Sequence, residues 1–333
     1  VLDSGAAMLG VARIEEGIQL RRQGIAAPIL ILGNTPPEFA DDLMAYHLTA
    51  AVSSLAAAER YAAAARQQGK QITIHIKIDT GMGRNGFLSD CFRTPATAAD
   101  TGALADIQAV CRLAGLAVEG IFSHFAMADA ADKASANRQF AVFSDLLAKI
   151  EKAGITIPIR HIANSAATID MPQTHLDMVR PGIAVYGLQP SDEVCLDRID
   201  LKPAMAVKAQ VAHLKTVGKD FNVSYGSTWT APAPTRIAVV PVGYADGFNR
   251  RLSSNGEMLV HGRRAPIVGR VCMDLTMIDV GHIADVAPGD EVVIFGRQGS
   301  EHLTADEIAA RLATINYEIV SAITARVPRV YVS

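Results

Sequence analysis

Between residues 8 and 188, short runs of β-branched and apolar residues alternate with longer stretches whose apolar residues recur every three or four positions. The short runs are typical of buried strands, and the longer stretches are typical of amphipathic helices. Strand and helix repeated in this order predict an α/β fold in which helices cover a parallel sheet. We predict strands at residues 8–12, 28–32, 48–53, 72–78, 118–125, 157–163 and 176–181, and helices at residues 14–24, 36–47, 55–69 and 136–154.

The number of predicted strands favours one architecture. A closed TIM-type (β/α)8 barrel has eight parallel strands, and seven are predicted here. Residues 1–4 resemble the end of a helix, so we expect a first strand with its helix to lie before Val1. An open doubly wound sheet needs no eighth strand, but no GxGxxG motif follows the first predicted strand to support a dinucleotide site. We therefore predict a (β/α)8 barrel that lacks its first strand.

From about residue 202 the sequence instead shows strand patterns separated by tight turns, for example at His261–Gly262. In this part only residues 304–315 are predicted to form a helix, with Thr304 as its N-cap. Pro190 and Pro203 bracket a polar connector between the two patterns. We predict a barrel domain over residues 1–200 and an all-β domain over residues 201–333.

Composition excludes several classes of protein. The net charge is −3, from 31 basic and 34 acidic residues, and no segment is basic enough to follow a nucleic-acid backbone. The apolar runs are too short to span a bilayer, and no charged n-region precedes an apolar h-region in these residues. Four separate cysteines without a CxxC motif predict reduced thiols in a soluble, cytoplasmic protein. No metal-binding motif, GxSxG elbow or phosphate-binding Walker loop is present.

Basic side chains occur at the ends of four predicted strands, where the functional groups of such barrels lie. They are Lys77, His124, His161 and Arg180. A single histidine at a strand end is often only a polar rim residue, but four such positions together favour a functional site. Arg84 follows in the glycine-rich segment TGMGRNG, which is either a flexible turn or a loop that presents an anion-binding guanidinium.

A phosphate site is predicted beside these residues. Asn164 and Ser165 begin a short helical stretch, and Gly182 and Ile183 offer backbone amides. The alternative is that Ser165 is part of an ordinary helix cap. In the β domain, Tyr225 and Asp274 stand out, although either could simply pack or pair within the fold. These patterns predict an anion-binding barrel with a β domain, and they specify no reaction.

The motifs, in this order, resemble those of the alanine racemase family over essentially the whole chain. The matching segments are GVARIEEG, HIKIDTGMGRNGF, GIFSHFA, NSAATID, MVRPGIAVYGL, SYGSTW, VVPVGYADGF, VGRVCMDLTMIDV and RVPRVYV. The resemblance implies a pyridoxal 5′-phosphate-dependent enzyme that interconverts L-alanine and D-alanine and supplies D-alanine for peptidoglycan. It also implies a homodimer in which each active site combines one barrel with the partner's β domain.

The resemblance further implies roles for individual residues. Arg180 would face the pyridine nitrogen of the cofactor, His124 would pack against its ring, and His161 would link Arg180 to the catalytic base. That base would be Tyr225 from the other subunit, which exchanges the Cα proton on the L-alanine face. The cofactor phosphate would be bound by Asn164, Ser165, Gly182 and Ile183.

The substrate carboxylate would be bound by Arg84, Met273 and Asp274, and Tyr244 would line the entrance. Lys77 matches a lysine that is carbamylated in some relatives. Two features depart from the family pattern. The cofactor lysine, in a motif like KANAYGHG, does not occur in these residues, and Ala325 stands where many relatives have a phosphate-contacting tyrosine.

Two other functions remain open. The protein could bind pyridoxal phosphate without turnover, because the cofactor lysine is missing. It could also be a racemase for serine or for a broader range of amino acids. Basic amino-acid decarboxylases, which share the scaffold, place an acidic residue at the pyridine nitrogen, and Arg180 argues against that class.

Overall fold

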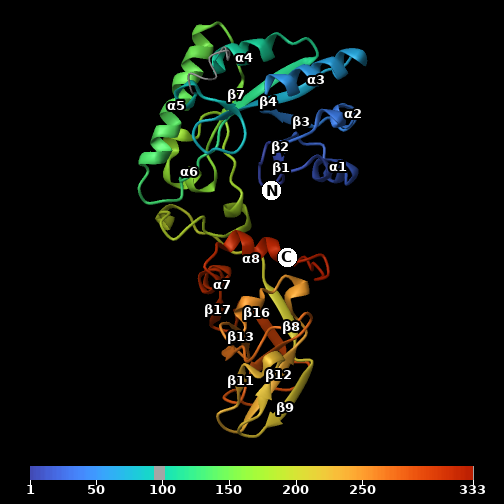
Figure 1. Ribbon diagram of the computed structural model, residues 1–333, viewed down its shortest axis with the longest axis vertical. Coiled ribbons are helices and arrows are strands. Elements are labelled where there is room, and N and C mark those ends of the chain that lie inside the picture. Colours follow the sequence, from blue (N-terminus) through green and yellow to red (C-terminus); the bar gives the residue numbers. More distant parts are fainter. Residues whose placement is uncertain (94–101, 333) are drawn as a thin grey trace. The chain divides into compact units, whose positions relative to one another are not determined.

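The computed structural model describes residues 1–93 and 102–332. The chain divides into two compact units, Val1–Leu201 and Lys202–Ser333, which are described separately (Figure 1). Each unit has its own main hydrophobic core.

Unit 1 is a parallel half-barrel covered by helices. Its strands are β1 (Leu9–Val11), β2 (Ile29–Asn34), β3 (Thr49–Val52), β4 (Ile72–Asp79), the short β5 (Phe87–Leu88), β6 (Leu116–Phe122) and β7 (Ile159–His161). Apart from β5, which pairs with β4, they lie side by side in sequence order. Its helices are α1 (Ile14–Arg22), α2 (Ala40–Ala45), α3 (Leu55–Gln67), α4 (Ala103–Arg112), α5 (Ala134–Lys152) and α6 (Ser165–Asp170).

Burial explains the strand composition of unit 1. All four residues of β3 are buried, and seven of the eight residues of β4 are buried, as expected for a parallel sheet covered on both faces. Helix α1 contacts β2, α3 contacts β3 and β4, and α4 contacts β6 (Figure 1). Ser54 caps α3 by accepting a hydrogen bond from the Ala57 amide at 3.3 Å.

Six of the seven predicted strands are confirmed, and the strand predicted at residues 176–181 is wrong. Leu176 has a φ of +50°, which does not belong to an extended strand. The Asp177 and Arg180 amides donate to Arg160 and Ala163 without forming a ladder. The segment therefore crosses the end of β7 as a loop, and this loop carries Arg180.

Unit 2 is a set of antiparallel sheets. Its strands are β8 (Val207–Gln210), β9 (His213–Val217), β10 (Asn222–Val223), β11 (Trp229–Thr230), β12 (Thr235–Val240), β13 (Glu257–Val260), β14 (Arg263–Pro266), β15 (Thr276–Asp279), β16 (Glu291–Gln298) and β17 (Glu301–Leu303). They form the orders β15-β12-β9, β14-β13-β16-β17 with β8 on β16, and β10-β11.

Two helices, α7 (Ala305–Leu312) and α8 (Asn316–Ala322), follow the last strand of unit 2. The predicted cap of α7 is confirmed, because Thr304 Oγ1 accepts a hydrogen bond from the Glu307 amide at 3.0 Å. Helix α8 and, in unit 1, α4 were not predicted. The segment RVPRVYV forms no strand, and its last three residues are exposed.

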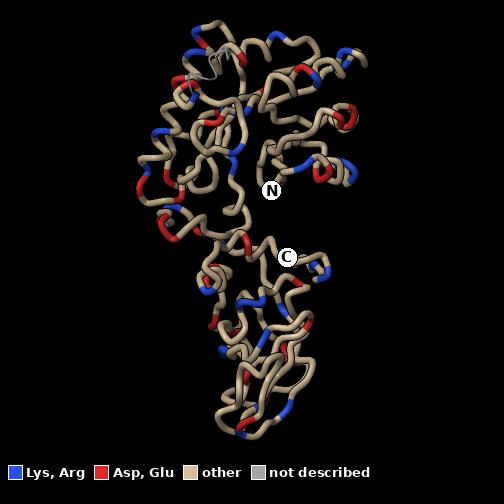
Figure 2. Tube along the Cα trace, in the orientation of Figure 1, with Lys and Arg blue, Asp and Glu red and all other residues tan. Residues whose placement is uncertain are grey.

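Charged residues of both signs are distributed over each unit (Figure 2). Within residues 1–93 and 102–332, no helix is both long enough and apolar enough to cross a membrane.

Candidate active site

The carboxyl ends of the parallel strands in unit 1 bring several basic residues to one edge of the sheet. Lys77 lies near the end of β4, His161 is the last residue of β7, and His124 follows β6 by two residues. Arg180 reaches the same edge from the loop after β7. Three of the four predicted residues therefore lie together because parallel strand ends meet at one edge, and Arg180 joins them from a loop.

Arg180 is held by an unusual set of acceptors. Its guanidinium contacts His161 Nδ1 at 2.5 Å, the Ser123 carbonyl at 2.8 Å and His124 Nδ1 at 3.1 Å, with a longer bond to a second carbonyl. No carboxylate in the described part of the chain is recorded as its partner. Burial and the neighbouring Arg84 lower the pKa of Arg180 to about 9, so its charge is retained at pH 7. The arrangement therefore fixes a cation without neutralising it.

His161 is one member of a buried chain of side chains. Its Nδ1 accepts from Arg180, and its Nε2 lies 2.8 Å from His75 Nδ1. The other nitrogen of His75, Nε2, lies 3.1 Å from the carboxylate of Glu119. Both ring nitrogens of His161 thus have partners inside unit 1, which leaves neither free to contact a catalytic base directly. His124 uses only Nδ1 for Arg180, and no partner of its Nε2 is recorded in the described residues.

The three histidines are neutral because protonation would place a charge in a buried, cationic region. Burial and then Arg180 lower the pKa of His124 to about 3. The same two causes, in the same order, strongly lower the pKa of His161. Burial also lowers the pKa of His75, although Glu119 acts in the opposite direction. Each ring can therefore donate from one nitrogen and accept at the other.

Lys77 is buried at 4% exposure beside the same cations. Its Nζ lies 5.4 Å from the centroid of the Phe122 ring, and Arg180 Cζ lies 5.2 Å from the same centroid. Burial, followed by Arg84 and Arg180, lowers the pKa of Lys77 to about 8. A larger fraction of this amine is consequently neutral at pH 7 than for a lysine in water.

The loop that carries Arg84 is organised by Asp79 at the end of β4. The Asp79 carboxylate accepts hydrogen bonds from the backbone amides of residues 81, 82, 83 and 84, at 2.9 to 3.1 Å. At Gly86 φ is +135°, and a Cβ would lie 2.5 Å from the Asp79 amide nitrogen, so the tight return of this loop requires glycine. Arg84 itself is exposed, and its guanidinium makes no hydrogen bond to any described residue, so it is available to bind an anion.

The predicted phosphate-binding residues also lie together. Asn164 caps α6 by accepting from the Ala167 amide at 3.0 Å. The Ser165 hydroxyl oxygen accepts from the amides of Gly182 and Ala184, at 2.8 and 3.4 Å. Its own hydrogen is then available to donate, as are the amides of Ser165 and Ile183, which begin α6 and the following helical turn. A set of neutral hydrogen-bond donors of this kind fits a phosphate group.

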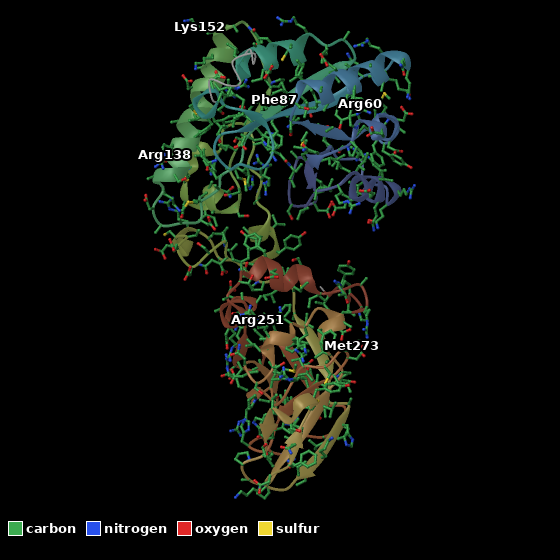
Figure 3. The ribbon with its side chains drawn as sticks, viewed as in Figure 1. Arg60, Phe87, Arg138, Lys152, Arg251 and Met273 are labelled. Atoms are coloured by element: carbon green, nitrogen blue, oxygen red, sulfur yellow. The ribbon has the colours of Figure 1, made fainter. Side chains whose placement is uncertain are left out.

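The remaining predicted residues belong to unit 2. Tyr225 is 72% exposed, Tyr244 is 42% exposed and Met273 is 53% exposed (Met273 is labelled in Figure 3). The amides of Tyr244 and Ala245 donate to the carbonyls of Cys272 and Met273, which joins two of these segments. Asp274 contacts Arg326 at 2.7 Å and is therefore already paired within unit 2.

Sequence reasoning missed His75, Glu119 and Gly120. The signal was present, because His75 interrupts the apolar strand segment ITIHIKI and a polar group inside a buried strand needs a partner. Gly120 lies opposite His75 in the pairing of β4 and β6. A Cβ at Gly120 would lie 2.5 Å from His75 Nδ1 and Cε1, so the missing side chain makes room for the imidazole.

Comparisons with known proteins agree with this geometry. The family model described as "Alanine racemase, N-terminal domain" matches residues 1–190, and "Alanine racemase, C-terminal domain" matches residues 204–331. An alanine racemase of Desulfosudis oleivorans is 55% identical over 330 residues, which are 99% of this chain and 84% of the relative.

Solved structures give the same result. An alanine racemase of Clostridium difficile 630 superposes with a TM-score of 0.91 at 40% identity, covering 99% of this chain and 83% of that one. A histidine racemase of Leuconostoc mesenteroides superposes with a TM-score of 0.89 at 28% identity, covering 100% of this chain and 86% of that one.

Proposed function

The chain belongs to the alanine racemase family, and we propose that it interconverts L-alanine and D-alanine with pyridoxal 5′-phosphate as its cofactor. The observation that carries the proposal is the placement of Arg180 among neutral acceptors, without a carboxylate partner. The D-alanine would supply peptidoglycan synthesis.

The residues present fit the cofactor at three points. Arg180 would donate to the pyridine nitrogen, His124 would lie against the ring, and the phosphate would be bound by Asn164, Ser165, Gly182 and Ile183. When bound, the cofactor withdraws electrons from the substrate Cα and makes its proton more acidic. The cofactor lysine of the family, in a motif like KANAYGHG, does not occur among the 333 residues.

Arg180 would favour racemisation over other reactions of this cofactor. A guanidinium does not give up its proton near neutral pH, so it would keep the pyridine nitrogen unprotonated. Without that proton, the bound ring would stabilise negative charge less well, which would favour return of a proton to Cα. A carboxylate at this point would have the opposite effect, and none of the described residues places one there.

Two-base exchange at Cα requires one base on each face of the substrate. Tyr225 would be the base on the L-alanine face, supplied by the β domain of a second copy of the chain in a homodimer. Its 72% exposure within one copy fits a residue whose surroundings are completed by a partner. Cations such as Arg180 and Lys77 would be needed to stabilise the ionised form of this phenol.

His124 replaces His161 as the proposed link between Arg180 and this base. Its Nδ1 is bonded to Arg180, and its Nε2 is free to contact the phenol oxygen. Because burial keeps the His124 ring neutral, the ring could transmit the polarising effect of Arg180 to the phenol through its two nitrogens without becoming protonated.

The substrate carboxylate would be bound by Arg84, with Met273 and Asp274 contributing from the β domain and Tyr244 lining the entrance. Asp79 would keep the loop of Arg84 in place through its four amide contacts. Carbamylation of Lys77 would add a negative charge beside Arg84 and orient its guanidinium.

A broader amino-acid racemase is the second candidate. The structure titled histidine racemase shares this fold at 28% identity, so the scaffold also carries a protein named for a larger substrate. A pyridoxal-phosphate-binding protein without turnover is the third candidate.

The test uses the full-length protein, including any residues before Val1, purified with pyridoxal 5′-phosphate. L-Alanine, L-serine and L-histidine are supplied separately, and the D-enantiomer is measured with a D-amino-acid oxidase. We expect D-alanine to form fastest, with equal amounts of both enantiomers at equilibrium. Faster turnover of serine or histidine would support the broader racemase, and cofactor binding without any D-product would support the non-catalytic binder.

A further inference from the structure

Gln139 is a buried polar residue that none of the proposed roles uses. It lies on α5 and is 4% exposed. Its buried companions on this helix include Phe143, Leu146 and Ile150, which are apolar. An amide among such neighbours costs free energy unless its donors and acceptor are all bonded.

All hydrogen-bonding groups of the Gln139 amide have partners, and each partner lies at the edge of the candidate site. Gln139 Oε1 accepts from the Ala126 amide at 2.9 Å. Gln139 Nε2 donates to the His124 carbonyl at 3.0 Å and to Thr80 Oγ1 at 3.4 Å. A reversed amide would set donor against donor and acceptor against acceptor, so these partners determine its orientation.

These contacts connect two strand ends. The hydrogen bonds to the His124 carbonyl and the Ala126 amide hold the turn that follows β6 against the side-chain amide of Gln139. The bond to Thr80 reaches the residue after β4, and Thr80 Oγ1 lies 2.7 Å from Ser123 Oγ. The Ser123 carbonyl in turn accepts from Arg180 at 2.8 Å. Gln139 is therefore bonded directly to the backbone of His124 and, through Thr80 and Ser123, to the support of Arg180.

We propose that Gln139 is a positioning residue that holds His124 against Arg180 and so sets the surface that receives the cofactor ring. The inference rests on the proposed function and extends it to a side chain on the outer helix. A leucine or methionine could fill the same space without the cost of burying an amide. What such a residue could not do is fix the carbonyl of His124 and the amide of Ala126 at once.

The test compares two substitutions with a matched control in the full-length protein. Gln139→Met keeps the length and approximate volume but removes the donors and the acceptor. Gln139→Glu keeps an acceptor for Ala126 and places a second acceptor against the His124 carbonyl. Phe143→Leu lies one turn further along α5, is fully buried, and has no recorded polar contact with the site, so it reports loss of packing alone.

Three quantities are measured: the melting temperature, the affinity for pyridoxal 5′-phosphate by absorbance titration, and kcat and KM for alanine. We expect both Gln139 variants to lose about 10- to 100-fold in kcat, the scale associated with small misplacements of catalytic groups. Their cofactor affinity should also fall, while KM should change less because Arg84 depends on Asp79. Phe143→Leu should lower the melting temperature and leave kcat and cofactor affinity close to those of the unaltered protein.

Hydrogen exchange of the Ala126 amide, measured without cofactor, adds a readout that does not depend on activity. Gln139→Met should increase its exchange, and Phe143→Leu should not. The proposal is overturned if Gln139→Met keeps cofactor affinity and kcat within twofold, or if Phe143→Leu reproduces its losses. If the unaltered protein does not racemise alanine, the proposed function fails, and the exchange and cofactor-affinity measurements still decide the role of Gln139.

Discussion

His75 Nδ1 lies 2.8 Å from His161 Nε2, and this contact determines where both imidazoles carry their protons. Arginine can only donate, so His161 Nδ1 must accept from Arg180 and the proton of His161 must be on Nε2. His75 Nδ1 then accepts that proton's hydrogen bond, and His75 Nε2–H donates to Glu119. One direction of donation therefore runs from Arg180 through both rings to a carboxylate.

The first prediction concerns these tautomers. At pH 7, nitrogen-15 NMR of labelled protein should show protons on Nε2 and none on Nδ1 for both His75 and His161. Glu119→Gln should preserve the pattern, because a side-chain amide oxygen can still accept from His75. A proton on Nδ1 of either ring would contradict the direction of donation.

The second prediction is that Gly120→Ala disrupts this chain. The added Cβ would lie 2.5 Å from the His75 ring, which is fully buried. We expect a loss of about 1–3 kcal/mol in the free energy of unfolding, measured with urea, from overpacking and lost hydrogen bonds. Gly10→Ala on β1 is the control, because its Cβ would meet only the flexible end of Leu32 at 3.2 Å. Equal losses in both variants would show that His75 is not the cause.

The third prediction is a loss of stability in acid. The pKa of His124 is lowered to about 3 in the folded protein, against about 6.5 when unfolded. Between these values the unfolded state binds more protons, so the free energy of unfolding falls as pH decreases from 6.5 towards 3. His124 contributes at most about 1.4 kcal/mol per pH unit to this slope. Urea unfolding of cofactor-free His124→Asn should show a shallower fall across this range, and an unchanged slope would contradict the prediction.

The fourth prediction concerns Lys77. Carbon dioxide reacts with a neutral amine to form a carbamate and release a proton. With a pKa of about 8, roughly a tenth of Lys77 is neutral at pH 7, far more than for an exposed lysine. Protein in carbon-13 bicarbonate should therefore show a carbamate NMR signal that increases with pH through 8. Lys77→Ala should lose the carbamate signal, whereas the control Lys70→Ala, at an exposed lysine, should keep it. A signal that persists in Lys77→Ala and disappears in Lys70→Ala would exclude Lys77 as its source.

The fifth prediction tests Tyr225 and the shared site together. Tyr225→Phe should lower racemase activity by about 10²- to 10⁴-fold, the usual contribution of a general acid or base. The melting temperature should change little, because the substitution removes only the phenol hydroxyl and keeps the ring. Tyr331→Phe, at a tyrosine that is 93% exposed, is the matched control and should keep full activity.

Mixing inactive variants distinguishes a shared site from one built within a single copy. Subunits carrying Tyr225→Phe and subunits carrying Arg180→Leu are unfolded, mixed in equal amounts and refolded. If each site uses both copies, a mixed dimer contains one intact site, and random pairing should restore about a quarter of the activity. No recovery, with mixed dimers demonstrated by mass spectrometry, would place both residues of a site in the same copy.

Much of the fold could be predicted because its signals are local. Helix and strand periodicity located six strands of the half-barrel, and the residue types alone placed the cap of α7 at Thr304. The segment at residues 176–181 failed because its apolar pattern resembles a strand, whereas a φ of +50° at Leu176 turns the chain across the end of β7. The strand-end rule brought Lys77, His124 and His161 to one edge, whereas Arg180 reaches that edge from the loop found in place of the predicted strand. The hydrogen-bond partners of these residues were not evident from the sequence.

The sequence by itself therefore determined the order of the elements, the class of the fold and which basic side chains gather at the sheet edge. Only the tertiary structure decided that His161 binds His75 and cannot also reach a distant base. The physical reason is register: β4 pairs His75 with Gly120, and β7 pairs His161 with Phe122. Register depends on contacts between strands that are far apart in the chain, and no periodicity within one strand encodes it.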